Sequence, residues 1–193
     1  MKLLHIDSSV LGENSASRSL TAAIVARLRA KHAGIELIHR DLAAQTLPHF
    51  TPVLKEGHPC VARNAEVLDE FLAADVVVIG APMYNFTIPT QLKAWIDRIL
   101  TVGKTFRYTE HGPEGLAGGK RVIIASARGG IYSEGPAATV DFQETYLKQV
   151  FGFIGIQDLE FVRAEGLNLG AGQREAALAH AHERIADEMS IAA

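Results

Sequence analysis

Short apolar runs alternate with longer segments that carry apolar residues on one helical face, and this alternation repeats five times along the chain. The clearest run is residues 75–80, Asp-Val-Val-Val-Ile-Gly. A run rich in β-branched residues indicates a buried strand, and strands that alternate with helices indicate βαβ units. Because βαβ crossovers are right-handed, the carboxyl ends of all strands lie at one rim. The sequence therefore predicts an α/β fold, a doubly wound five-stranded parallel sheet with helices on both faces.

The strands are expected at residues 2–7, 35–40, 75–80, 121–125 and 157–164, and the helices at residues 18–32, 61–73, 90–100, 137–153 and 173–189. Ser17 is the expected N-cap of the first helix. The expected buried face of the second helix consists of Val61, Ala65, Leu68, Phe71 and Leu72. Residues 101–119 are expected to be irregular, and residues 1–193 to form a single domain.

Composition excludes several classes of function. The net charge of −3 comes without a basic block, so nothing supports nucleic-acid binding. No apolar run approaches the ~18–20 residues that span a membrane. The single cysteine, Cys60, cannot form an intrachain disulfide, and the amino-terminal residues lack a secretory pattern, so we expect a cytoplasmic location. The histidines show no convergent spacing with acidic residues, so we predict no metal site; His5 is expected in the core.

The loop after the first strand is rich in serine, with Ser8, Ser9, Ser15 and Ser17 ahead of a helix. Hydroxyls, backbone N–H groups and the positive end of the helix dipole together suit an anion, and Arg18 would add charge. Helix capping is the alternative, but it explains one serine well and four poorly. The loop matches neither the P-loop motif nor G-x-G-x-x-G, so the expected anion is a terminal monophosphate.

The loop after the third strand, residues 81–89, reads Ala-Pro-Met-Tyr-Asn-Phe-Thr-Ile-Pro. It lies at the carboxyl end of a central strand, where open α/β sheets bind ligands. Its aromatic residues could instead be core that continues past the strand. Because Asn85 lies between Tyr84 and Phe86 and prolines flank all three, we favour a wall for a flat, partly polar ring.

The loop after the fourth strand contains Arg128, Gly129 and Gly130. Paired glycines let the backbone approach a ligand and present its N–H groups. A tight turn would explain a lone Gly-Gly pair, but a position on the same rim favours ligand contact. A monophosphate site in the first loop with ring-binding walls in the other two describes an FMN site, as in flavodoxins with strand order 2-1-3-4-5.

At these residues the sequence resembles the FMN-dependent NADH azoreductases, also called NADH:quinone oxidoreductases. The matching motifs span residues 3 to about 166 and are Asp7-Ser8-Ser9 with Ser15-x-Ser17-Arg18, Ala81-Pro82-Met83-Tyr84-Asn85-Phe86, Pro89-x-x-Leu92-Lys93-x-x-Ile96-Asp97, Lys104-Thr105-Phe106-x-Tyr108, Gly115-Leu116 and Arg128-Gly129-Gly130.

The resemblance implies a flavodoxin-like homodimer with FMN at two interfacial sites, NADH as electron donor, and quinones or azo compounds as acceptors. It implies that FMN is bound by Ser9, Ser15, Ala16, Ser17, Met83, Tyr84, Asn85, Phe86, Ala127, Arg128, Gly129 and Gly130. This chain has Ala127 where the family often has serine, with Ser126 one place earlier. A backbone contact would survive that change, whereas a hydroxyl contact would not.

The flavin is expected to carry the chemistry, without a catalytic side chain, by ping-pong hydride transfer from the nicotinamide to the acceptor. The N–H groups of Gly129 and Gly130 would face the negative charge of the reduced ring. The residues expected to line the acceptor site are Phe106, Tyr108, Phe151 and Phe153. For the last two, which would come from a partner subunit, helix core is the alternative. An aromatic wall favours flat acceptors.

Two other classes of protein stay open. A flavodoxin-type electron carrier would share the fold and the cofactor, and an interaction protein could have kept the fold and lost the flavin. Electron carriers of this kind tend to be strongly acidic, so the small net charge of −3 and the additional aromatic residues favour the enzyme.

Overall fold

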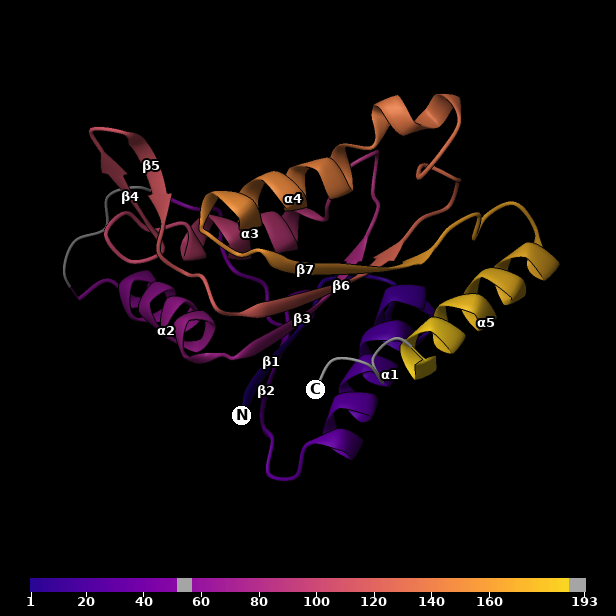
Figure 1. Ribbon diagram of the computed structural model, residues 1–193, viewed down its shortest axis with the longest axis horizontal. Helices are drawn as coiled ribbons and strands as arrows, with labels where there is room; N and C mark the ends of the chain where they lie inside the picture. The colour runs from indigo at the N-terminus through magenta and orange to yellow at the C-terminus, as the bar shows by residue number, and fades with distance from the viewer. Residues whose placement is uncertain (52–56, 188–193) are drawn as a thin grey trace.

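β3 (Val76–Pro82) is the central strand and is buried along its whole length. The computed structural model describes residues 1–51 and 57–187. β3 pairs in parallel with β1 (Lys2–Asp7) and β6 (Arg121–Ala127), while β2 (Glu36–Asp41) and β7 (Asp158–Ala164) form the edges. The order β2-β1-β3-β6-β7 confirms the predicted 2-1-3-4-5, because β4 and β5 belong to a separate hairpin (Figure 1).

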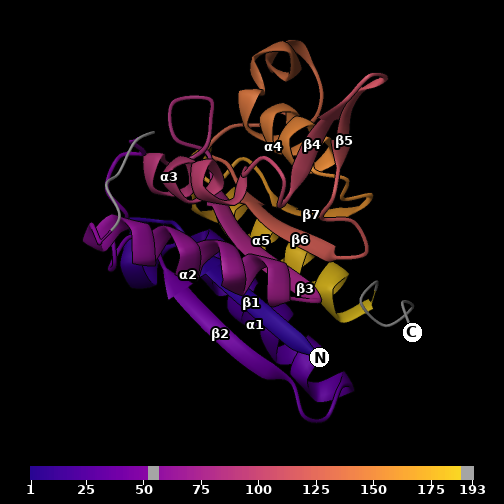
Figure 2. The same cartoon turned by 90° about the vertical axis from the view of Figure 1, so that its left-hand side faces the viewer.

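Helices cover both faces of the sheet. One face carries α1 (Ala16–Lys31) and α5 (Ala171–Asp187), and the other carries α2 (Pro59–Ala73), α3 (Thr90–Ile99) and α4 (Phe142–Phe153). Figure 2 shows α2 in front of the strands and α1 behind them. Two apolar cores result, one on each side of the sheet. No helix in the described part of the chain is both long and apolar enough to cross a membrane.

The first helix begins earlier than predicted. α1 starts at Ala16, and its N-cap is Ser15, whose hydroxyl accepts the N–H of Arg18 at 3.3 Å. Ser17 is already helical, so the prediction that it is the N-cap is wrong. A serine two residues earlier caps equally well, and only the backbone geometry separates the two.

The second helix turns a different face to the core. Val67 and Phe71 are fully buried, whereas Val61 is 38% exposed and Ala65 is exposed. The predicted face is therefore wrong at Val61 and Ala65. The buried guanidinium of Arg98 donates a hydrogen bond of 2.7 Å to Asn64, so a polar residue lies on the inward side of this helix. Hydrophobic periodicity does not detect a polar residue that faces inward to satisfy a buried charge.

Two segments differ from the sequence expectation. One was expected to be irregular and forms a hairpin, and the other was expected to be one helix and is divided in two. Within residues 101–119, β4 (Phe106–Thr109) and β5 (Gly112–Gly115) form an antiparallel hairpin. The predicted helix at 137–153 is a 3-10 turn, η2 (Pro136–Val140), followed by α4, which Asp141 caps through the N–H groups of Gln143 and Glu144. The expected end of the last helix, Met189, lies outside the described residues.

The hairpin β4–β5 lies at the end of the sheet opposite the carboxyl rim. Figure 1 shows it on the left, while β6 and β7 end on the right. Gly115 fixes this position, because a Cβ atom there would overlap the backbone of Ile154 and Gly155 at the end of α4. The close approach of the two backbones therefore requires glycine at residue 115.

We predict that Gly115→Ala destabilises the protein by about 1–3 kcal/mol or more, because neither backbone can move away without repacking. Gly152→Ala is the matched control: it lies within α4, and its Cβ would meet no described atom within 4 Å. That variant should gain about 0.5–1 kcal/mol from higher helix propensity. Chemical denaturation measures both, and equal stability of the two variants would contradict the prediction.

Candidate functional site

Two adjoining cavities lie at the carboxyl rim. The first, of about 180 Å³, extends from the start of α1 to the loop after β6, and the second, of about 270 Å³, continues past it. They share Met83, Gly129 and Asn168, so they form one groove. The remaining lining residues of the first are Ser9, Leu11, Asn14, Ser15, Ala16, Ser17, Pro82, Tyr84, Ala127, Arg128, Leu167 and Arg174; those of the second are Asn85, Phe86, Gly130 and Tyr132.

The first cavity begins at the amino end of α1. The hydroxyls of Ser15 and Ser17 lie 3.1 Å apart and are buried, and the first N–H groups of the helix have no partner within it. The Ser9 hydroxyl lies 3.2 Å from the hydroxyl of Tyr84, which ties the first loop to the second. Hydroxyls and helix N–H groups at the positive end of a helix dipole form a site for an anion.

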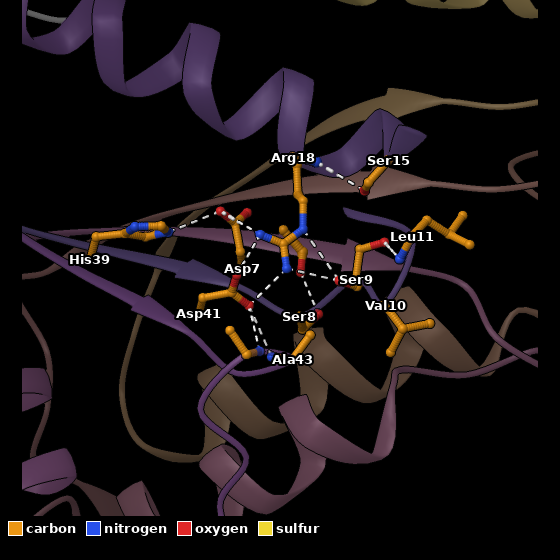
Figure 3. Close-up of polar contacts among 12 residues, drawn as sticks. Asp7, Ser8, Ser9, Val10, Leu11, Ser15, Arg18, His39, Asp41 and Ala43 are labelled. Carbon is orange, nitrogen blue, oxygen red and sulfur yellow. Dashed lines mark hydrogen bonds and ion pairs between the residues drawn. The ribbon is translucent and has the colours of Figure 1, made fainter. Parts of the chain in front are cut away.

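Arg18 is not among the residues that line the cavity. It contacts the loop through Ser9 and is paired with Asp41 (Figure 3). Its guanidinium donates to the Ser9 carbonyl at 2.9 and 3.2 Å and to both carboxylate oxygens of Asp41 at 2.7 Å. The bond from Arg18 lowers the pKa of Asp41 to about 2, so Asp41 stays ionised and neutralises the guanidinium. The expectation that Arg18 adds charge to the anion site is therefore wrong.

The second loop is a tight turn with strained backbone. Tyr84 and Thr87 exchange two backbone hydrogen bonds, of 2.9 and 3.2 Å, around Asn85 and Phe86. Both central residues have positive φ, 49° and 71°, as a type I′ turn requires. Asparagine tolerates this conformation, but a bulky phenylalanine rarely adopts it. The turn holds the half-exposed Phe86 ring against Tyr132, with the ring centroids 6.3 Å apart.

The third loop is held to the loop after β7 by its carbonyl groups. Gly129 accepts the N–H of Asn168 at 3.0 Å, and Gly130 accepts the N–H of Gly166 at 2.9 Å. The N–H groups of Gly129 and Gly130 themselves donate to no other residue in the part of the chain that the structure describes. They remain available as a pair of backbone donors beside the second cavity.

The side chain of Arg128 points away from the groove. It is fully buried and contacts three carboxylates, with Asp141 at 3.0 Å, Glu165 at 3.1 Å and Glu144 closest. Burial raises the pKa of Glu144, but Arg163 and Arg128 together hold it below the ordinary value. Arg128 thus joins β6, α4 and the loop after β7, and only its backbone can line the cavity.

Ser126 does not replace the serine that residue 127 lacks. Its hydroxyl accepts from Arg128 Nε at 3.0 Å and donates to Gln143 at 3.2 Å, both in the protein interior. Ala127 lines the cavity, and its carbonyl accepts the N–H of Met83 at 2.8 Å. Backbone contacts at residue 127 are therefore available in this chain, and a hydroxyl contact is not.

The groove brings together all twelve residues predicted to bind the cofactor. The lining residues that sequence reasoning did not name as cofactor contacts are Leu11, Asn14, Pro82, Tyr132, Leu167, Asn168 and Arg174. The last three follow β7, whose carboxyl end lies on the same rim as the other strands. The predicted topology already places the end of the fifth strand on this rim. The loop after that strand could therefore have been predicted to line the groove together with the other three loops.

The four aromatic residues predicted to line the acceptor site lie elsewhere in the chain. Phe151 is fully buried in the core, so its prediction is wrong; its helix packs on the sheet, and helix core was the alternative. Phe106 packs against Tyr108 and Phe153, with centroid distances of 5.6 and 4.7 Å. Phe106 and Tyr108 belong to β4 and Phe153 ends α4, and Figure 1 shows β4 at the end of the sheet opposite the ends of β6 and β7.

The chain is similar in sequence to a known family and to named relatives over nearly its whole length. Residues 1–189 match the family described as having a flavodoxin-like fold. The FMN-dependent NADH:quinone oxidoreductase of Sinorhizobium fredii is 59% identical, over 97% of this chain and 96% of the relative. The enzyme of the same name from Ralstonia nicotianae is 52% identical, over 100% of this chain and 99% of the relative.

Solved structures agree with these relatives. An azoreductase from Bacillus anthracis superposes with a TM-score of 0.88 at 33% identity, over 96% of this chain and 97% of the other. An FMN-dependent NADH-azoreductase from the same organism, solved in complex with FMN, superposes with a TM-score of 0.85 at 26% identity and the same coverage. With its fold, its rim groove and these similarities taken together, the chain belongs to the family of FMN-dependent NADH:quinone oxidoreductases.

Proposed function

We propose that this chain oxidises NADH and reduces quinones and azo compounds, with FMN bound in the rim groove. The observation that carries the proposal is the continuity of the groove, which joins an anion site at the start of α1 to a slot between residues 83–86 and 129–130. A phosphate and a flat ring attached to one another need such a pair of sites. The names of the relatives support the same cofactor, donor and acceptors.

The phosphate end of the groove fits FMN. Ser15 and Ser17 offer hydroxyls, the first turn of α1 offers N–H groups, and Arg174 from α5 offers a positive charge. Arg174 is oriented by a 3.2 Å hydrogen bond to the carbonyl of Asn14. A doubly charged phosphate at this place would be stabilised by the helix dipole and the guanidinium together.

The ring end of the groove also fits FMN. The two cavities together fall within the roughly 300–1,000 Å³ typical of ligand sites. When bound, FMN would supply the chemistry of hydride transfer between NADH and the acceptor. The chain's own part is to hold the ring between the Met83–Phe86 turn and the Gly129–Gly130 backbone. Those two N–H groups would stabilise negative charge on the ring, because backbone donors held in place need no reorganisation.

We further propose that the chain acts as a homodimer. Tyr108 is 72% exposed and its ring contacts Phe106, which packs on Phe153; its strand, β4, lies at the end of the sheet opposite the carboxyl rim. Within one chain these rings cannot line the acceptor side, but a second copy could place them there. Exposed apolar side chains on the rim loops, including Val10, Leu11 and Phe86, offer the surface for such contact.

A cytoplasmic location, which the lone Cys60 supports, is testable by cell fractionation.

The mass of the protein in solution tests the proposed dimer. Sedimentation equilibrium of the FMN-loaded protein should give twice the monomer mass of 20.8 kDa. Tyr108→Ala should raise KM for the acceptor more than it changes FMN affinity, because its ring would line the acceptor side from the partner. A mass of one chain at micromolar concentration would refute the dimer.

The enzyme and the electron carrier respond differently to NADH alone. We expect anaerobic mixing with NADH in a stopped-flow instrument to bleach the visible absorbance of the bound flavin before any acceptor is added. Addition of a quinone should then restore the absorbance. A carrier would need a separate reductase, so flavin that stays oxidised in excess NADH would exclude the proposed activity.

The strained turn allows a test of the ring site by itself. We expect Asn85→Ala to weaken FMN binding about tenfold or more, a loss of about 1.4 kcal/mol, because alanine disfavours positive φ and lacks the amide. Asn85→Gly should lose less, since glycine keeps the backbone conformation. Thr87→Ala, at an exposed position in the same turn, is the control. Fluorescence titration of apoprotein with FMN measures all three, and full affinity in Asn85→Ala would mean that the turn is not the ring's wall.

A further inference from the structure

Four polar side chains gather on one face of β1 and β2. The parallel register pairs His5 with His39 and Asp7 with Asp41, and residues two apart on a strand share a face. Strand pairing thus brings together residues that are more than thirty positions apart in sequence. The sequence-based expectation that no histidine converges with acidic residues is wrong at this place, because spacing along the chain does not show register.

Three ligand atoms of this cluster converge. Asp7 Oδ2 lies 3.0 Å from His39 Nε2 and 3.3 Å from His5 Nε2, and the two rings stack with centroids 4.3 Å apart. All three atoms lie within 4.8 Å of one another. Zinc bonds of roughly 2.0–2.2 Å in a tetrahedron place neighbouring ligand atoms roughly 3.3–3.6 Å apart. Small shifts of the rings would therefore accommodate an ion between them. Figure 3 shows His39 directed toward Asp7.

His5 provides an independent reason to expect a ligand. The residue is only 8% exposed, and its Nε2 atom makes no hydrogen bond of good geometry within residues 1–51 and 57–187, although it lies 3.3 Å from Asp7 Oδ2. A buried polar atom without a partner costs about 1–3 kcal/mol, so native proteins rarely retain one without a purpose. A metal ion bonded to Nε2 would satisfy it, and this atom points toward the Asp7 carboxylate.

The Asp7 oxygen that faces the two histidines is Oδ2, which is hydrogen-bonded to His39 at 3.0 Å. The Thr21 hydroxyl donates to the other oxygen, Oδ1, at 2.9 Å, which orients the carboxylate as outer partners of metal ligands do. An aspartate carboxylate is ordinarily ionised at neutral pH, as a metal ligand must be.

The charge balance of the cluster permits a divalent cation. The charged groups that face it are Asp7, Asp41 and Arg18, whose Nη1 lies 3.7 Å from Asp7 Oδ2. Two carboxylates and one guanidinium sum to −1, and Arg18 is already paired with Asp41 at 2.7 Å. Neutral imidazoles add nothing to this sum. The His39 side chain is 45% exposed on an edge strand, which opens a path for an ion and for a water ligand.

We propose that His5, His39 and Asp7 bind one Zn²⁺ per chain, as a site of two imidazoles and one carboxylate with a fourth position open to solvent. Two nitrogen ligands and one oxygen ligand are a set that zinc accepts. The site lies behind the anion loop, since Arg18 contacts both Asp7 and the Ser9 carbonyl. It lies outside the groove and does not rest on the proposed function.

A second group of histidine and cysteine serves as the matched control. His49, His58 and Cys60 line a cavity on another part of the surface, together with Arg98. His58 Nδ1 there accepts the N–H of Cys60 at 3.2 Å, so that atom already has a partner. Among the described residues no carboxylate lines this cavity, and the buried guanidinium of Arg98 repels a cation there. We therefore expect His58→Ala to leave zinc binding unchanged.

The test is a calorimetric titration of chelator-treated, FMN-loaded protein with Zn²⁺. The unaltered protein should bind one ion per chain. His39→Ala removes a zinc ligand. Its zinc affinity should therefore fall by more than the roughly 10–100-fold that follows the loss of a residue hydrogen-bonded to a ligand. His39→Gln provides a second variant at the same edge position, which keeps a polar side chain. Because His39 is partly exposed, neither change should prevent folding, and the visible spectrum of bound flavin checks this.

A second measurement distinguishes a cluster that binds zinc from one that binds only protons. In ¹⁵N-resolved spectra of the histidine rings, one equivalent of Zn²⁺ should shift the Nε2 signals of His5 and His39 and leave those of His58 in place. Equal zinc affinity of His39→Ala and the unaltered protein would overturn the proposal. So would ring signals of His5 and His39 that respond to pH and not to zinc.

Discussion

The parallel register of β1, β3 and β6 is the constraint on which the rest of the structure depends. It pairs Asp7 with Gly80 and Pro82 with Ala127, so three strands end at nearly the same level. The loops that follow them can then share one groove without long excursions of the backbone. A slip of one residue in β3 would turn its side chains to the opposite face and separate Met83 from the carbonyl of Ala127.

Two arginines hold the rim loops, and neither uses its charge on the groove. Arg18 binds the Ser9 carbonyl and Asp41 from one side, and Arg128 binds carboxylates beneath the glycine loop from the other. Because each guanidinium is already paired, the positive charge that the described lining residues offer the groove comes from Arg174, at its phosphate end. Buried pairs of this kind are poor evidence for stability, and their best-attested contribution is to specify geometry.

Period and composition were sufficient for the fold class and the loops of the rim, and the likeness to flavodoxins supplied the strand order. The sequence was insufficient where a partner from a distant segment decides the outcome. The inward side of α2 depends on Arg98 meeting Asn64. The hairpin β4–β5 depends on two glycine backbones, Gly115 and Gly155, touching. The position of Arg128 depends on carboxylates from α4 and from beyond β7, so its motif suggested a ring contact that its side chain does not make.

The turn at Asn85 and Phe86 has a consequence for how the groove fills. Positive φ at a bulky residue is disfavoured by about 1–3 kcal/mol unless the surroundings hold it. With the groove vacant, a fraction of molecules would relax this turn, and only the remainder would be competent to bind. The apparent affinity for a flat ligand is then the intrinsic affinity reduced by the competent fraction. Packing of Phe86 on Tyr132 would raise that fraction, so a residue outside the motif, Tyr132, would share control over occupancy.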